Sequence, residues 1–246
     1  MNGADPDRWS DVAAGWAELW GGFAEPAWRA VLEASGTGPG ARVLDVGCGS
    51  GDFLGYCGGR GMTTAGIDPA PGMVALARRR SPDVRLGGAE KLPWSDGTFD
   101  LATSFNALQF AEDTDEALAE MVRVTVPGGR VAVANWAEAA LNELDAVERA
   151  LDGGPPPPDG DLRLPGGLGE LLADGGLDDV VEGLAEVPWE VPDDDALVRG
   201  VLLGEDPGGA EAVLAASAPY RRTGGGYRLV NHFRFAVGRK GPAAAR

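Results

Sequence analysis

The chain has 246 residues, a formal net charge of −17 at pH 7 and a sequence pI of about 4.4. This length is enough for one large α/β domain with a full hydrophobic core. Proteins that bind nucleic acid usually carry basic patches, so this acidic chain is not expected to bind it. No apolar stretch reaches membrane-spanning length, so we do not expect a membrane as a partner either.

The few cysteines and histidines argue against a metal centre. Cys48, Cys57 and His232 are the only residues of these types, which is too few for a zinc site. A disulfide would distort the glycine-rich turn that contains Cys48, so reduced thiols in the cytoplasm are the simpler interpretation. Residues 1–7 are polar and acidic and do not resemble a signal peptide. We therefore expect a cytoplasmic protein without a bound metal.

The first 40 residues predict two helices, over 9–20 and about 26–35. Apolar residues recur in the first helix at helical spacing, and several of them are tryptophans. This face either docks on the core or covers a ligand as a lid. Trp16 and Trp20 are our candidates for contact with a substrate.

A glycine-rich turn follows the first predicted strand, residues 42–46. The strand is apolar, as in a buried parallel sheet, and runs directly into Gly47, Gly49 and Gly51. Because glycine has no Cβ, a ligand can approach the backbone N–H groups closely there. A second strand-like run, 62–67, ends in Asp68, whose carboxylate could accept hydrogen bonds from both hydroxyls of a ribose. Together these features predict a nucleoside-binding corner.

The residues around the turn favour a cationic nucleoside. In the dinucleotide fingerprint G-x-G-x-x-G the third glycine faces the pyrophosphate, but this chain has Asp52 at that position. A carboxylate is unfavourable beside a pyrophosphate. Asp45, just before the turn, would instead attract a cation. S-adenosylmethionine, which combines a ribose with a charged amine, fits better than a nicotinamide dinucleotide.

Further strands are predicted near 84–86, over 99–104 and over 130–135. Asn106 and Gln109 follow the carboxyl end of the second of these, and ligands bind at that edge of open α/β sheets. Capping of the loop is the alternative for both amides. Trp136, at the same edge of the next strand, is a candidate substrate wall.

The last third of the chain begins with a break rich in glycine and proline, residues 152–169, which contains four consecutive prolines. It is a stiff connection that serves either as a surface loop or as part of a substrate cap. Helices are then predicted over 168–176, from Asp193 and over 210–216, and strands over 180–189 and 227–237. His232, in the last strand, has the pattern of a packed or surface residue.

Taken in order, these motifs resemble those of class I S-adenosylmethionine-dependent methyltransferases, and most closely the ubiquinone/menaquinone-biosynthesis type (methyltransferase type 11). The matching segments are 43–51 (VLDVGCGSG), 67–69 (IDP) with Met73, 88–94 (GAEKLPW), 99–100 (FD) with 104–110, 123–124 (RV) with 127–130 (PGGR), and the closing segment 227–239.

The resemblance implies a doubly wound α/β fold, the Rossmann-like methyltransferase fold. Its mostly parallel seven-stranded sheet has an antiparallel last strand and an amino-terminal helical lid. We expect a single domain over 1–246, with a lid (1–40), a cofactor-binding half (41–136) and a substrate-side half (137–246).

The resemblance also implies S-adenosylmethionine as the cofactor and assigns residues to it. Members of the family usually carry an acid at the position of Gly88, and here the backbone of Ala89 and the side chain of Glu90 are candidate replacements. The full cofactor-binding set is Asp45, Gly47, Cys48, Gly49, Asp68, Pro69, Met73, Gly88, Ala89, Glu90, Asn106 and Gln109.

The activity implied is methyl transfer to an O, C or N atom of a small molecule, for example a secondary metabolite or a quinone-like compound. Methyl transfer depends mainly on proximity and needs a base only if the acceptor must lose a proton. No histidine lies near the predicted strand tips, so we name no catalytic residue. The alternatives are a non-methylating enzyme that uses the bound cofactor for another reaction such as a cyclisation, a nicotinamide-dependent oxidoreductase, and a non-catalytic binding protein. We expect a monomer or a homodimer.

Overall fold

The computed structural model describes residues 5–152, 158–205 and 207–242. Its helices and strands are, in chain order, α1 (Pro6–Leu19), α2 (Glu25–Ser35), β1 (Arg42–Val46), α3 (Asp52–Gly58), β2 (Thr63–Asp68), α4 (Pro71–Ala77), β3 (Asp83–Leu86), β4 (Phe99–Phe105), α5 (Thr114–Val124), β5 (Thr125–Trp136), α6 (Glu143–Asp152), α7 (Gly167–Asp174), β6 (Leu177–Glu186), β7 (Trp189–Val191), α8 (Asp194–Val201), α9 (Ala210–Ser217), β8 (Tyr227–Leu229) and β9 (His232–Lys240).

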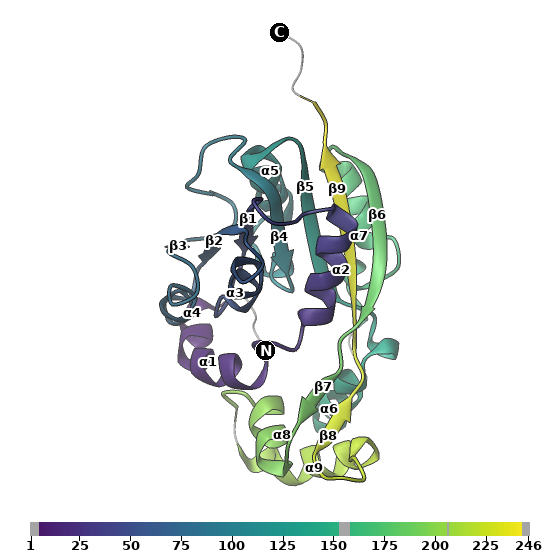
Figure 1. Cartoon of the computed structure of the whole chain (residues 1–246). Coiled ribbons are helices and arrows are strands. Elements are labelled where there is room, and N and C mark those ends of the chain that lie inside the picture. Colours follow the sequence, from purple (N-terminus) through teal and green to yellow (C-terminus); the bar gives the residue numbers. More distant parts are fainter. Residues whose placement is uncertain (1–4, 153–157, 206, 243–246) are drawn as a thin grey trace.

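The main sheet has seven strands in the order β3-β2-β1-β4-β5-β9-β6 (Figure 1). Strands β3, β2, β1, β4 and β5 are parallel, and β9 runs antiparallel to both β5 and β6. The strand order reverses at β1 and β4, so a crevice opens beyond their carboxyl ends. The predicted doubly wound sheet with an antiparallel last strand is confirmed.

Helices cover both faces of this sheet. Along β5 the side chains alternate: Ala132 and Ala134 join the core layer beneath α2 and α3, whereas Val131 and Val133 join the layer beneath α5 and α7. A strand covered on both faces needs apolar residues at successive positions, and this explains the unbroken apolar run in β5. Within the described residues, no helix is long and apolar enough to cross a membrane.

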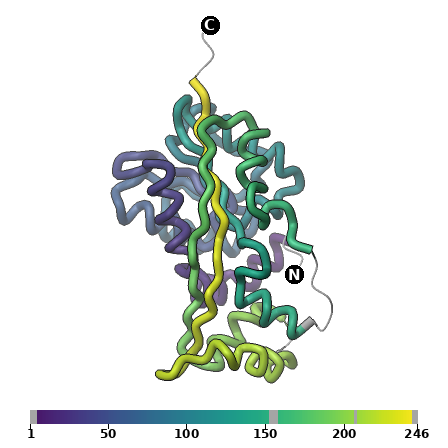
Figure 2. The backbone as a smooth tube through the Cα atoms, turned by 90° about the vertical axis from the view of Figure 1, so that its right-hand side faces the viewer, coloured from purple at the N-terminus to yellow at the C-terminus, as the bar shows by residue number. Residues whose placement is uncertain are grey.

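A smaller unit, which we call the cap, consists of β7, β8, α6, α8 and α9. Figures 1 and 2 show β6 and β9 running side by side from the main sheet down to it. The predicted continuous strands over 180–189 and 227–237 are therefore wrong, since each divides between the two sheets. Pro188 has no N–H for the ladder, and Asn231 turns its side chain to accept the N–H of Leu144 in α6 (3.0 Å).

Helix α1 is packed between the main sheet and the cap. On one side, the N–H of Gly72 in α4 donates to the Ser10 hydroxyl (3.1 Å). On the other side, Trp20, just after α1, stacks on Trp189 with ring centroids 4.0 Å apart. The Trp20 indole donates to the carbonyl of Gly200 (3.2 Å), and the Trp189 indole donates to a carbonyl at the end of α1 (2.9 Å). These contacts hold α1 across the carboxyl edge of the sheet.

Part of the predicted 152–169 break, residues 153–157, lies outside the described residues. The described remainder contains a short 3-10 turn, Asp161–Arg163, and the start of α7.

Candidate functional site

The glycine turn after β1 is fastened to the end of β2. The N–H groups of Gly47 and Cys48 donate to the carbonyl of Ile67 at 2.9 and 3.0 Å. Gly47 has a φ of 74°, and a Cβ there would collide with Ala107, two residues after β4. By contrast, a Cβ built on Gly49 meets nothing within 4 Å. The turn thus needs glycine at 47 for close packing, and at 49 it leaves open space for a ligand.

Asp68 lies at the tip of β2, facing this turn. One carboxylate oxygen accepts the N–H of Gly49 (2.8 Å) and the other accepts the N–H of Ala70 (2.9 Å). Its side chain is almost fully buried, and this burial raises its pKa. Each oxygen keeps a lone pair for a further donor, so the carboxylate is fixed in position and still able to bind a ligand hydroxyl.

Asp45 is the second buried carboxylate. It is 3% exposed and accepts a hydrogen bond from the Thr103 hydroxyl (2.8 Å). Burial, together with the negative charge of Asp68, raises its pKa to about 7, although the Thr103 hydrogen bond opposes the shift. Within the described residues, neither Asp45 nor Asp68 has a cationic partner at ion-pair distance. Two buried carboxylates without a counter-charge favour a cationic ligand.

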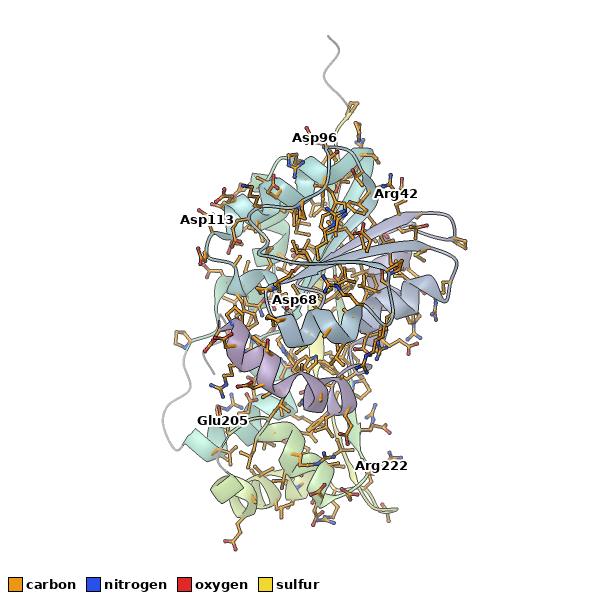
Figure 3. All side chains as sticks on the ribbon, turned by 90° about the vertical axis from the view of Figure 1, so that its left-hand side faces the viewer. Arg42, Asp68, Asp96, Asp113, Glu205 and Arg222 are labelled. Atoms are coloured by element: carbon orange, nitrogen blue, oxygen red, sulfur yellow. The ribbon has the colours of Figure 1, made fainter. Side chains whose placement is uncertain are left out.

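Both carboxylates line a cavity of about 290 Å³ at the carboxyl edge of the sheet. In Figure 3, Asp68 lies between the sheet and the helices that cover this edge, whereas Arg42, at the start of β1, lies toward the opposite end. Most of the sequence-predicted residues line the cavity: Trp16, Trp20, Asp45, Gly47, Cys48, Gly49, Asp68, Pro69, Met73, Gly88, Ala89, Glu90 and Asn106. The fold therefore brings them together, and their individual roles stay predictions.

Two predicted residues, Gln109 and Trp136, do not line the cavity. The Gln109 amide donates to the backbone and side-chain oxygens of Asn106, at 3.1 Å each, so it supports the loop after β4. Trp136 packs against Phe23 and Phe233, with centroids 5.4 and 4.9 Å apart. Since both phenylalanines line the cavity, Trp136 lies behind its wall.

The loop after β3 lacks an acid at position 88 but has one close by. A Cβ on Gly88 would lie 2.7 Å from a carboxylate oxygen of Glu90. The other oxygen of Glu90 accepts the N–H of Glu112 (2.8 Å). The Glu90 carboxylate thus lies where a side chain at position 88 would begin. This position is expected if Glu90 replaces the acid that members of the family usually carry at 88.

Sequence reasoning missed much of the aromatic wall. Trp28, Phe53 and Phe105 form a tilted series of rings with centroids 5.8 and 4.7 Å apart, and all three line the cavity together with Phe23 and Phe233. Helical spacing marks Trp28 and Phe53 as packing residues, and they do pack. A local pattern gives no sign that these rings also line a cavity.

His232 lies away from this cavity. Its Nδ1 atom is 2.9 Å from the carbonyl of Leu141. In the described parts of the chain, no group of three or more His, Cys, Asp or Glu residues is arranged to hold a metal ion.

Part of the chain around this site is similar to known methyltransferases. Residues 44–133, which include the glycine turn, Asp68 and the loop after β3, match the family model described as "Methyltransferase domain". The chain is 40% identical over 121 residues to a demethylmenaquinone methyltransferase of Beutenbergia cavernae, covering 48% of this chain and 50% of the relative. It is 38% identical over 117 residues to a malonyl-[acyl-carrier protein] O-methyltransferase of Serratia marcescens, covering 47% and 46%. The chain thus matches about half the length of these curated relatives.

Solved structures share the fold more completely. The YcgJ protein from Bacillus subtilis superposes with a TM-score of 0.61 at 18% identity, over 88% of this chain and 99% of that one. The [4+2]-cyclase SpnF superposes with a TM-score of 0.58 at 20% identity, over 89% and 82%. The predicted resemblance to methyltransferases is confirmed over residues 44–133, and the Rossmann-like fold over most of the chain.

Proposed function

We propose that this protein transfers the methyl group of S-adenosylmethionine to a small-molecule acceptor. The observation that carries the proposal is the pair of buried carboxylates, Asp45 and Asp68, that face one cavity without a cationic partner among the described residues. S-adenosylmethionine offers a sulfonium and an ammonium to this charge, and ribose hydroxyls to Asp68.

The residues around the cavity fit this ligand. The open space beside Gly49 would receive the amino-acid end, with Asp45 near the ammonium and Asp68 on the ribose. Pro69 and Met73 would line one face of the adenine, and Ala89 and Glu90 its edge. The bound cofactor supplies a methyl group already activated by the sulfonium charge. The contribution of the protein is then to orient the acceptor and to exclude water, which the aromatic walls and α1 favour.

A nicotinamide dinucleotide fits less well. The Asp52 carboxylate lines the cavity just past the glycine turn, although it pairs with Arg80 (2.9 Å), and a carboxylate is unfavourable near the place of a pyrophosphate. Asp52 occupies the position of the third glycine of the dinucleotide fingerprint.

Calorimetric titration with S-adenosylmethionine, S-adenosylhomocysteine and NADH tests the proposal. We expect micromolar binding of the two adenosyl ligands and none of NADH. Absence of binding by both adenosyl ligands would refute the proposal. A methylated product, detected by mass, separates methyl transfer from the alternative in which the bound cofactor serves another reaction such as a cyclisation.

The proposal extends to the setting of the enzyme. We propose a single methyltransferase domain that works in the cytoplasm as a monomer or a homodimer, without nucleic acid. The buried thiols of Cys48 and Cys57 and the net charge of −17 support it. Light scattering after size exclusion measures the oligomeric state.

A further inference from the structure

Among the described residues, the charged side chains that line the cavity are all acidic, although Asp52 pairs with Arg80, which does not line it (2.9 Å). Five carboxylates line it and, among the described residues, no lysine, arginine or histidine does. These carboxylates are Asp45, Asp52, Asp68, Glu90 and Glu112. Charges enclosed by low-dielectric walls are screened far less than charges on an open surface. The cavity therefore attracts cations and repels anions.

Aromatic side chains form much of the remaining wall. Trp20 and Phe23, with centroids 5.1 Å apart, come from the end of α1 and the turn before α2. Phe23 also meets Phe233 edge to face at 5.6 Å, and Phe53 meets Phe105 at 4.7 Å. The faces of such rings bind both apolar ring systems and cationic nitrogen.

Asp52 links the acidic and the aromatic parts. It precedes Phe53 at the start of α3, and its carboxylate lies under the turn between Trp20 and Phe23, because a Cβ on Gly21 would be 2.8 Å from its oxygen. The Ser50 hydroxyl donates to the other oxygen (2.5 Å), and the Arg80 guanidinium pairs with the first (2.9 Å). The carboxylate is only 14% exposed. It is the acid placed beside the aromatic wall, at a position that we assign to no part of the cofactor.

We propose that the methyl acceptor is an amine carried on an apolar, ring-containing body. This inference rests on the proposed methyltransferase function and narrows its substrate class. A carboxylate or a phenolate acceptor would enter a cavity lined by five acidic side chains, with no cationic side chain among the described lining residues to receive it. An amine is attracted by the carboxylates, and its apolar body can pack on the rings.

The reaction balances without a further reagent. The ammonium form first loses a proton to water. The nitrogen lone pair then forms the N–C bond while the C–S bond breaks and its electron pair stays on sulfur. The positive charge passes from sulfur to nitrogen, so a cation lies in the acidic cavity before and after transfer. A carboxylate acceptor would instead have to bring its negative charge into the acidic cavity before methylation could remove that charge.

The binding of matched probes to the protein saturated with S-adenosylhomocysteine tests this inference. Phenethylamine and 3-phenylpropionate carry opposite charges on a similar body, as do tryptamine and indole-3-propionate. We expect each amine to bind at least roughly tenfold more tightly than its carboxylate in calorimetry. We also expect the amines to gain one methyl group by mass spectrometry, at a rate that rises with pH. Equal or tighter binding of the carboxylates, or no binding of either amine, would overturn the inference.

Two variants test whether the preference for amines over carboxylates arises at the cavity. Asp52→Asn should lower the ratio of amine to carboxylate affinity by roughly threefold or more, while binding of S-adenosylhomocysteine persists. Asp96→Asn is the matched control, since Asp96 also pairs with an arginine (Arg123, 2.7 Å) but lies far from Asp68 in Figure 3. If both variants lower the ratio of amine to carboxylate affinity equally, the net charge of the protein, and not the cavity, sets the preference for amines. If the unmodified protein does not bind S-adenosylhomocysteine at all, the proposed function is refuted, and not only the inference about the acceptor.

Discussion

Replacing Asp45 by asparagine should stabilise the ligand-free protein at neutral pH. The carboxylate is 3% exposed, and its pKa is raised from 3.8 to about 7. Between these two values the folded protein keeps a proton that the unfolded chain has lost, so the free energy of unfolding falls as pH rises. One pKa unit corresponds to about 1.36 kcal/mol, which makes the full effect about 4 kcal/mol. Asparagine keeps an acceptor for the Thr103 hydroxyl and carries no charge.

Urea denaturation of both proteins at pH 5 and pH 8 measures this effect. Most of the range in which Asp45 is protonated only in the folded protein lies between these two pH values. The free energy of unfolding of the variant, relative to the unmodified protein, should therefore grow by about 3 kcal/mol from pH 5 to pH 8. The affinity for S-adenosylmethionine should change in the opposite sense, because the variant loses a charge that attracts the cation. A stability difference that is the same at both pH values would refute the argument that Asp45 is buried without a counter-charge.

Three further substitutions test the site and the packing of α1. Asp68→Ala should weaken S-adenosylmethionine binding by about 1.5–3 kcal/mol, because charged hydrogen bonds to the ribose are lost; unchanged affinity in calorimetry would contradict the assignment. Gly72→Ala places a Cβ 2.6–2.7 Å from backbone atoms of α1 and should cost about 1–3 kcal/mol of stability and expose α1 to protease, whereas Gly58→Ala, whose Cβ meets nothing within 4 Å, should leave cleavage of α1 unchanged. Trp20→Ala removes the stack on Trp189 and should destabilise the protein by about 3–5 kcal/mol in urea; a loss below about 1 kcal/mol would show that this stack does not hold α1 to the cap.

Local patterns in the sequence were sufficient for the centre of the fold. The apolar run before Gly47 and the acid at the end of the next strand depend only on neighbouring residues and on the hand of a βαβ unit. Parallel strands end at one edge, so Asp45, Gly49 and Asp68 had to meet there. This rule predicts the nucleoside-binding corner, whereas the full sheet and most of the other cavity residues were predicted from the resemblance to methyltransferases.

The sequence alone could not place the breaks in the last strands or the partners of α1. Residues 180–189 are predicted as one strand, but the chain leaves the main sheet near Pro188 because the cap offers β7 a different partner, β8. Trp20 has helical spacing, which predicts a buried face without identifying what covers it. Its partner Trp189 is distant in sequence, and only the packed chain brings the two rings together.

The sequence by itself determined the sheet, the glycine turn and the acid at the tip of β2, because strand and turn formation depend on short-range periodicity. The tertiary structure alone decided which charges face one another. Aspartates and glutamates are spread along the whole chain, and no local pattern shows that five of them, from four separate segments, line one cavity without a cationic side chain among the described residues. That arrangement comes from long-range packing, and it is the basis for the proposed amine acceptor.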